Sequence, residues 1–258
     1  MKSAEVVAEE ATGTSNAGIH VFDILELSKN RLGGGSPFAG FEAALAPLIH
    51  DVAATGRILE VGGGRSPLGP GMGVSNSQLT VNDVSQKELD FLPGDTTTAL
   101  FDIAQPSHIP ADLHGQFDLI YSRSVFEHVS SVESAMQSTH ALLRPGGKAI
   151  HFFPTLFATP FVVNRILPFD ATRSLVKFLI GDSYERFPAH YAGTWITRKN
   201  VERWERIGFR RVAPIQFFGH SYFRRFPPIS KAAARFNQLA EDRKMSALGA
   251  FVYLCVEK

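Results

Sequence analysis

Three consecutive glycines, Gly62, Gly63 and Gly64, follow the apolar run 57–61 and are the clearest chemical signal in the chain. Glycine lets the backbone adopt positive φ and pass close to a ligand, and free N–H groups in such a turn favour a polar or anionic ligand group. A plain connection between a strand and a helix also uses glycines, so the neighbouring residues must decide between the two interpretations.

An acidic residue, Asp83, ends the next apolar run, 78–83, and stands 21 residues after Gly62. A carboxylate at this position can accept hydrogen bonds from ribose hydroxyls, both in dinucleotide enzymes and in S-adenosylmethionine enzymes. The dinucleotide fingerprint requires G-x-G-x-x-G. Pro67 occupies its third glycine position and Glu60 precedes the glycines, and both features favour S-adenosylmethionine.

Three segments together resemble the class I S-adenosylmethionine-dependent methyltransferases, in particular their type 11 group. They are Glu60-x-Gly62-x-Gly64, residues 117–122 with 125–129, and Leu-Arg-Pro-Gly-Gly-Lys at 143–148. The resemblance is strong over 57–153 and concerns only topology over 197–258. It implies an enzyme that transfers a methyl group from S-adenosylmethionine.

The resemblance implies which residues hold the methionine part of this cofactor. Glu60 would orient the glycine loop and the amino group. Gly62 and Gly64 would approach the methionine part, with Gly63 between them, and Ser122 would contribute backbone contacts.

It also implies which residues hold the nucleoside. Asp83 would bind the ribose, with Val84 beside the adenine. Asp102 would accept a hydrogen bond from the adenine amino group, with Ile103 packed on the ring.

Two features depart from the family pattern. Ser66 replaces the third glycine, and the stretch 67–73 is so rich in glycine and proline that it supports only a short helix. Arg65 is a candidate to compensate by pairing with the methionine carboxylate.

A sulfonium methyl is a strong electrophile, so the enzyme must mainly align the acceptor, but an oxygen acceptor also needs a general base. The candidates are His128, which also fits a structural packing role, His190, Tyr191 and His220. Residues 121–124, Tyr-Ser-Arg-Ser, stand where methyltransferases acting on nucleobase or protein amides have Asn/Asp-Pro-Pro-Tyr. We therefore expect methylation of a small or lipid-linked acceptor on oxygen.

Composition and charge narrow the class of protein. The 258 residues carry a net charge of +1 and 44% apolar residues, as in an ordinary globular protein. The basic stretch 198–211 could bind phosphate or RNA, but a solvated helix face explains it better, so we expect no nucleic-acid partner. Cys255 is the single cysteine, which fits a reducing compartment. We expect no bound metal, no targeting or transmembrane segment, and a cytoplasmic protein.

The elements that must position these residues alternate between strands and helices, which indicates a parallel α/β sheet whose ligands bind beyond the carboxyl ends of the strands. We predict a Rossmann-like doubly wound seven-stranded sheet with an antiparallel last strand, an N-terminal helical cap and an inserted helical lid. The expected strands are 57–61, 78–83, 99–102, 117–122, 148–153, 211–218 and 250–256. The expected helices are 19–31, 38–54, 85–91 (N-cap Ser85, with Glu88 completing a capping box), 132–143, 197–207 (N-cap Thr197) and 231–243.

The chain divides into five parts: a disordered tail 1–18, the cap 19–56, the cofactor-binding half 57–153, the insertion 154–196 and the C-terminal part 197–258. The insertion also fits a dimer contact or a shallow membrane contact, and we favour a substrate lid. Two other functions remain open: a non-catalytic cofactor-binding protein with a regulatory or assembly role, and an NAD-dependent oxidoreductase.

Overall fold

The computed structural model describes residues 37–52, 54–155, 190, 193–219 and 227–258. The predicted tail 1–18, the predicted helix 19–31 and most of the insertion 154–196 lie outside these described residues. The fold below therefore concerns the sheet and the helices that cover it.

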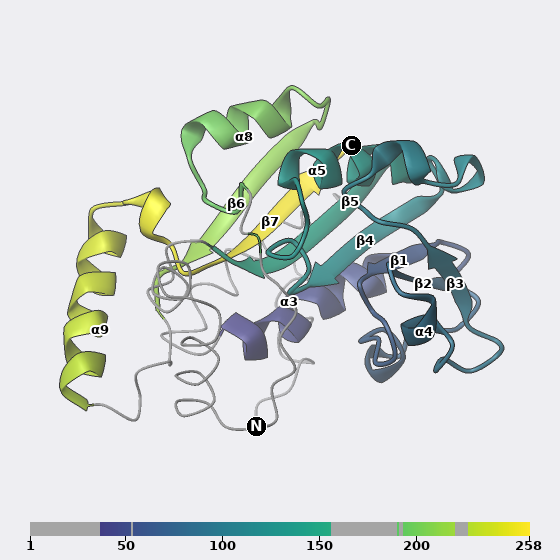
Figure 1. Ribbon diagram of the computed structural model, residues 1–258, viewed down its shortest axis with the longest axis horizontal. Helices are drawn as coiled ribbons and strands as arrows, with labels where there is room; N and C mark the ends of the chain where they lie inside the picture. The colour runs from purple at the N-terminus through teal and green to yellow at the C-terminus, as the bar shows by residue number, and fades with distance from the viewer. Residues whose placement is uncertain (1–36, 53, 156–189, 191–192, 220–226) are drawn as a thin grey trace, which may run out of the picture.

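Seven strands form one sheet in the described part of the chain, in the order β3-β2-β1-β4-β5-β7-β6 (Figure 1). They are β1 (Ile58–Val61), β2 (Leu79–Asp83), β3 (Thr97–Leu100), β4 (Phe117–Arg123), β5 (Leu143–Pro154), β6 (Arg211–Phe217) and β7 (Phe251–Glu257). The first five strands pair in parallel, whereas β7 runs antiparallel to both β5 and β6. The predicted doubly wound sheet with a reversed last strand is confirmed.

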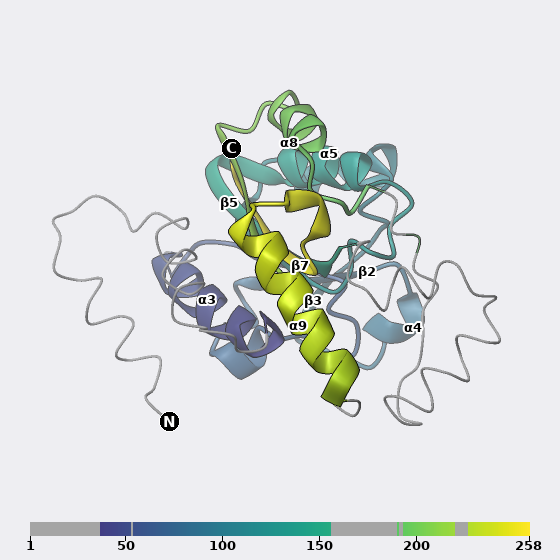
Figure 2. The same ribbon diagram turned by 90° about the vertical axis from the view of Figure 1, so that its left-hand side faces the viewer.

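Helices cover both faces of the sheet (Figures 1 and 2). α3 (Pro37–Asp51) lies on one face, and α5 (Val132–Leu142) and α8 (Arg198–Glu205) lie on the other. Two further helices are α4 (Gln86–Leu89), beside β2, and α9 (Pro227–Asp242), between β6 and β7 in sequence. Each face buries an apolar cluster, one around Phe41 and Tyr253 and one around Met136 and Trp204.

The apolar spacing of α5 explains why this segment is a helix and which side it buries. Val132, Ala135, Met136, Thr139 and Leu142 are buried, and they recur every three or four residues along one helix face. The side chain of Ser131 caps the first turn by accepting a hydrogen bond from the Ser134 N–H. The loop between β4 and this cap is therefore fixed at both ends.

Several predicted boundaries were wrong by a few residues. β3 ends at Leu100, before Asp102, because the Asp102 carboxylate accepts a hydrogen bond from the Ala104 N–H and turns the chain there. β5 begins at Leu143 and not at 148, because residues 144–147 form an irregularity at which the register with β4 shifts. α9 begins at Pro227, four residues earlier than predicted, since proline is well accepted in the first helical turn.

The two predicted helix caps have different outcomes. Thr197 caps α8 through a hydrogen bond from the Asn200 N–H, as predicted. The capping box at Ser85 was wrong, because the Ser85 side chain makes no cap hydrogen bond. Glu88 instead pairs with Arg65, at 2.6 Å, where a charged partner binds its carboxylate more strongly than a backbone N–H would.

Candidate functional site

The predicted cofactor residues meet at one edge of the sheet. The glycine loop follows β1, Asp83 ends β2, Asp102 lies two residues beyond β3, and Ser122 lies near the end of β4. These four strands are parallel neighbours, so their carboxyl ends face the same edge. Ligands of open α/β sheets bind beyond this edge.

The glycine loop is packed too tightly for side chains. A Cβ atom on Gly62, at φ +69°, would lie 2.4 Å from Cγ2 of Val125, in the loop after β4. A Cβ atom on Gly63 would lie 2.8 Å from Cγ1 of Val81. The Gly63 N–H also donates to the Asn82 carbonyl at 3.1 Å. The loop is therefore pinned to β2 on one side and to the β4 loop on the other.

Glu60 holds the backbone that follows the glycine loop. It is buried, and its carboxylate accepts hydrogen bonds from the N–H groups of Leu68 and Gly69 and, at 2.6 Å, from the Tyr121 hydroxyl. Burial raises the pKa of Glu60, although these donors and Arg123 act to lower it. Holding the loop is one part of the role expected for Glu60, and contact with an amino group of the cofactor remains a prediction.

The first helix after the glycine loop is reduced to the 3-10 turn Pro70–Met72, in line with the expectation of a short helix. The pairing of Arg65 with the methionine carboxylate remains a prediction, and in this structure Arg65 has another partner. Its guanidinium makes two 2.6 Å hydrogen bonds with Glu88 and lies over the Phe91 ring. These partners secure α4 against the glycine loop, so Arg65 is engaged in a structural contact.

Asp83 and Val84 present opposite chemistry side by side at the end of β2. Oδ1 of Asp83 accepts a hydrogen bond from the Ser85 N–H at 2.9 Å, and burial raises the pKa of this carboxyl group. The Val84 side chain is 68% exposed, which is unusual for valine. The contacts expected of Asp83 with a ribose and of Val84 with an adenine remain predictions.

The Asp102 carboxylate is used by its own loop. It accepts hydrogen bonds from the Ala104 N–H and from Nε2 of Gln105. Ile103 is only 2% exposed and packs in the core. The adenine contacts expected of Asp102 and Ile103 remain predictions, and the burial of Ile103 leaves its side chain little surface for a ring.

Ser122 is fully buried and anchors a histidine that sequence reasoning missed. Its hydroxyl lies 2.9 Å from Nδ1 of His151, whose Nε2 lies 3.2 Å from the Thr139 hydroxyl. The His151 ring also stacks on Phe126, and burial lowers its pKa to about 3. His151 is therefore a neutral core histidine, and the backbone role expected of Ser122 remains a prediction.

Two of the residues predicted to supply a general base, His128 and His190, lie at the loop after β4. His128 lies in this loop, with Nε2 3.9 Å from Oε1 of Glu127, and the His190 N–H donates to the Glu127 carbonyl at 2.9 Å. The structure thus brings His128 and the backbone of His190 to the same loop. Tyr191 and His220 lie outside the described residues.

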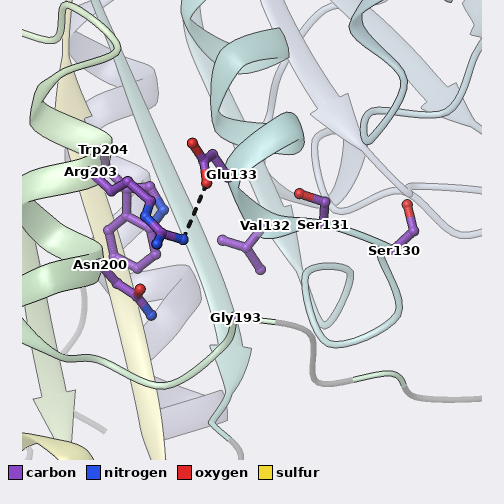
Figure 3. Close-up of a pocket in the computed structure, with 8 residues that line it drawn as sticks. All are labelled: Ser130, Ser131, Val132, Glu133, Gly193, Asn200, Arg203 and Trp204. Atoms are coloured by element: carbon purple, nitrogen blue, oxygen red, sulfur yellow. Dashed lines mark hydrogen bonds and ion pairs between the residues drawn. The ribbon is translucent and has the colours of Figure 1, made fainter.

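A pocket of about 240 Å³ lies between the start of α5 and α8 (Figure 3). An ion pair between Arg203 and Glu133, 3.4 Å apart, crosses it. Its lining residues are Ser130, Ser131, Val132, Glu133, Gly193, Asn200, Arg203 and Trp204. It contains none of the predicted cofactor residues, and it adjoins the loop of His128 in sequence.

The described residues contain neither a membrane-spanning helix nor a cluster of metal ligands. None of their helices is long and apolar enough to cross a bilayer. They also contain no group of three or more His, Cys, Asp or Glu side chains arranged to hold a metal ion.

Comparisons with known proteins point to one family. A family model described as "Methyltransferase domain" matches residues 38–210. The ubiquinone biosynthesis O-methyltransferase of Bordetella pertussis is 32% identical over 108 residues, which cover 40% of this chain and 44% of that protein. The protein of the same name from Dechloromonas aromatica is 25% identical over 178 residues, which cover 64% and 68% of the two chains. The chain thus matches less than half of the first relative's length.

A solved structure shares the fold. Phosphoethanolamine N-methyltransferase 2 of Haemonchus contortus, in complex with S-adenosyl-L-methionine, aligns with a TM-score of 0.51 and 13% identity, over 100% of this chain and 60% of that one. At this identity the likeness concerns the fold alone.

Proposed function

This chain belongs to the family of methyltransferase domains, and from that premise we propose that it transfers a methyl group from S-adenosylmethionine to an oxygen atom of a small or lipid-linked acceptor. The observation that carries the proposal is the arrangement at the carboxyl edge of β1 and β2. There a glycine loop lies beside a carboxylate, and the carboxylate lies beside the exposed Val84.

The described residues fit the two ends of the cofactor. Gly62, Gly63 and Gly64 form the turn at which the methionine part would bind, and Glu60 holds the backbone that follows this turn, at Leu68 and Gly69. The Asp83 carboxylate is placed to accept hydrogen bonds from ribose hydroxyls. The cofactor supplies a methyl group on a sulfonium, which is a strong electrophile.

Two observations support oxygen as the acceptor atom. The relatives from Bordetella pertussis and Dechloromonas aromatica are both named O-methyltransferases. The residues at 121–124 also lack the Asn/Asp-Pro-Pro-Tyr pattern typical of enzymes that methylate amide or nucleobase nitrogen. The acceptor itself is proposed only as a class, a small or lipid-linked molecule with a hydroxyl group.

The work of the protein is to align the acceptor, exclude water and receive a proton. We propose His128, His190 and Tyr191 as the groups from which the general base comes. His128 has the strongest support among them, because its side chain is one-third exposed beside the buried Glu127 at the sheet edge. A partly exposed imidazole can take a proton from the acceptor and return it to solvent.

The first test is thermal unfolding with S-adenosylhomocysteine and, separately, with NADH. A ligand at 100 times its Kd adds about 2.7 kcal/mol to the free energy of unfolding, which raises Tm by several degrees in a chain of this size. We expect a rise with S-adenosylhomocysteine and none with NADH.

The alternatives predict different results. A rise with NADH alone would replace the proposal by an NAD-dependent oxidoreductase. A rise with S-adenosylhomocysteine, but no methyl transfer to any of a wide panel of phenols and alcohols, would favour a non-catalytic cofactor-binding protein.

A further inference from the structure

Glu127 carries a buried carboxyl oxygen that no group of the described residues binds. The residue is 5% exposed, and its Oε2 has no hydrogen-bond partner, a condition shared in the described residues only with the Ser138 hydroxyl. An unpaired buried polar atom costs free energy, so nearly all such atoms in native proteins have a partner. Within the part of the chain that the structure describes, Oε2 of Glu127 therefore lacks the partner that a buried carboxyl oxygen normally has.

Glu127 lies in a loop that contacts both the glycine loop and His190. It lies in the loop after β4, and Val125 of the same loop is the side chain against which Gly62 packs. From the other side, His190 of the insertion donates its N–H to the Glu127 carbonyl. The loop that carries Glu127 therefore contacts the glycine loop through Val125 and the backbone of His190 through the Glu127 carbonyl.

A second titratable group connects this buried carboxyl to solvent. Nε2 of His128 is 3.9 Å from Oε1 of Glu127, and the His128 side chain is 33% exposed. Oε1 thus faces a group that can exchange protons with water, while Oε2 has no hydrogen-bond partner among the described residues.

We propose that Oε2 of Glu127, in place of the His128 imidazole, is the group that accepts the proton of the acceptor hydroxyl during methyl transfer, and that His128 only passes this proton on to solvent. This inference rests on the proposed function. The acceptor O–H bond breaks and its proton moves to the Glu127 carboxylate, while the oxygen forms a bond to the methyl carbon. The bond between that carbon and sulfur breaks, and its electron pair stays on sulfur. The negative carboxylate and the positive sulfonium are thus neutralised in one step.

The surroundings of Glu127 suit this role. Burial raises its pKa to about 8, and its own backbone N–H acts in the opposite direction. The imidazole of His128 is a titratable group that faces this carboxyl, with Nε2 3.9 Å from Oε1. A carboxylate with a raised pKa is a stronger base than an exposed one, and closer in basicity to the hydroxyl that it deprotonates.

The test measures protons and needs no acceptor. A base that reaches the acceptor oxygen also lies near the sulfonium, because the reacting atoms approach to about 3–3.5 Å. The positive sulfonium should lower the pKa of Glu127 and release its proton, whereas neutral sulfur should not. Calorimetric titration at pH 7.5, in two buffers of different ionisation enthalpy, gives the protons released on binding S-adenosylmethionine and S-adenosylhomocysteine. With a free pKa near 8, the expected release is up to about three quarters of a proton for the sulfonium ligand.

The decisive comparison is between wild type and Glu127→Gln, since ionisable groups of the ligands are the same in both and cancel. We expect the extra proton release with S-adenosylmethionine to disappear in this variant and to persist in Glu202→Gln, a surface control on α8. Glu127→Met serves as a second variant, because an apolar side chain often replaces a buried charge without loss of stability.

The outcomes separate the two proposals. Equal proton release in wild type and both Glu127 variants would overturn the role of Glu127 and leave cofactor binding intact. Failure of the wild type to bind either ligand would overturn the proposed function, and the role of Glu127 with it.

Discussion

The Asp83 carboxylate is the residue on which cofactor recognition should depend most. Asp83→Ala removes both hydrogen bonds expected to the ribose, each with a net value of about 0.5–1.5 kcal/mol. We expect the Kd for S-adenosylhomocysteine, measured by calorimetry, to rise roughly tenfold or more. Asp90→Ala removes an exposed carboxylate that binds Gln86 on α4, and it should leave this Kd unchanged. Equal affinity in the folded Asp83 variant would contradict the assigned site.

The Gly62 position should tolerate no side chain. Gly62→Ala places a Cβ atom 2.4 Å from Cγ2 of Val125 and forces alanine to φ +69°. We expect the free energy of unfolding in urea to fall by about 1–3 kcal/mol. Gly71→Ala is the matched control, because its Cβ would meet no atom within 4 Å. A loss of similar size in both variants would show that crowding by Val125 is not the cause.

Individual site residues differed in how far the sequence could predict them. Glu60 and Asp83 were predictable because a glycine loop and a strand end fix their places from local sequence alone. The hydrogen bond from Tyr121 to Glu60 and the unpaired oxygen of Glu127 were not, since both depend on which distant segments pack together. The pairing of Arg65 with Glu88 was missed for the same reason, because the two residues are 23 positions apart.

The first residues of α8 and α4 allow a comparison between a helix with a side-chain cap and a helix without one. Thr197→Ala removes the hydrogen bond that the Thr197 side chain accepts from the Asn200 N–H. The cost should be about 1 kcal/mol in the free energy of unfolding. Ser85→Ala should cost much less, because the Ser85 side chain makes no cap hydrogen bond. Urea unfolding of both variants measures the difference, and equal losses would contradict the cap geometry.

Helices and strands were predictable where the spacing of apolar residues is regular. Their ends were less predictable where contacts with distant residues determine them. The apolar spacing of α5 and the alternation of strands and helices were sufficient for the topology. The ends of β3 and β5 were not, because a side-chain hydrogen bond of Asp102 ends the first and a register shift against β4 extends the second.

Two buried groups should give the stability of the whole molecule a characteristic dependence on pH. His151 has a pKa lowered to about 3. Between about pH 3 and 6.5 the unfolded chain therefore binds a proton that the native protein does not, and the free energy of unfolding decreases as the pH is lowered. Glu127 has a pKa raised to about 8, so between about 4.5 and 8 the native protein keeps a proton that the unfolded chain loses, and stability falls as pH rises. Each effect reaches at most about 1.4 kcal/mol per pH unit.

The two effects oppose each other between about pH 4.5 and 6.5, and each acts alone outside that window. Relative to wild type, His151→Gln should gain stability as the pH falls from 6.5, and Glu127→Gln should gain stability as the pH rises from 4.5 to 8. Urea unfolding at several pH values from 3.5 to 8.5 measures these differences. If the free energy of unfolding of a variant changes with pH as that of the wild type does, the substituted group is not a source of the pH dependence.

The sheet places β7 between β5 and β6, although β7 is the last of the three to be synthesised. On the ribosome, β6 emerges before the strand with which it must pair exists. Residues 218–257 must follow before β7 can join both neighbours. Until then the edge of β5 has no partner from this part of the sheet, and open strand edges favour association between chains. A nascent chain stalled after β6 should therefore be a strong substrate for chaperones, whereas one that has released β7 should not.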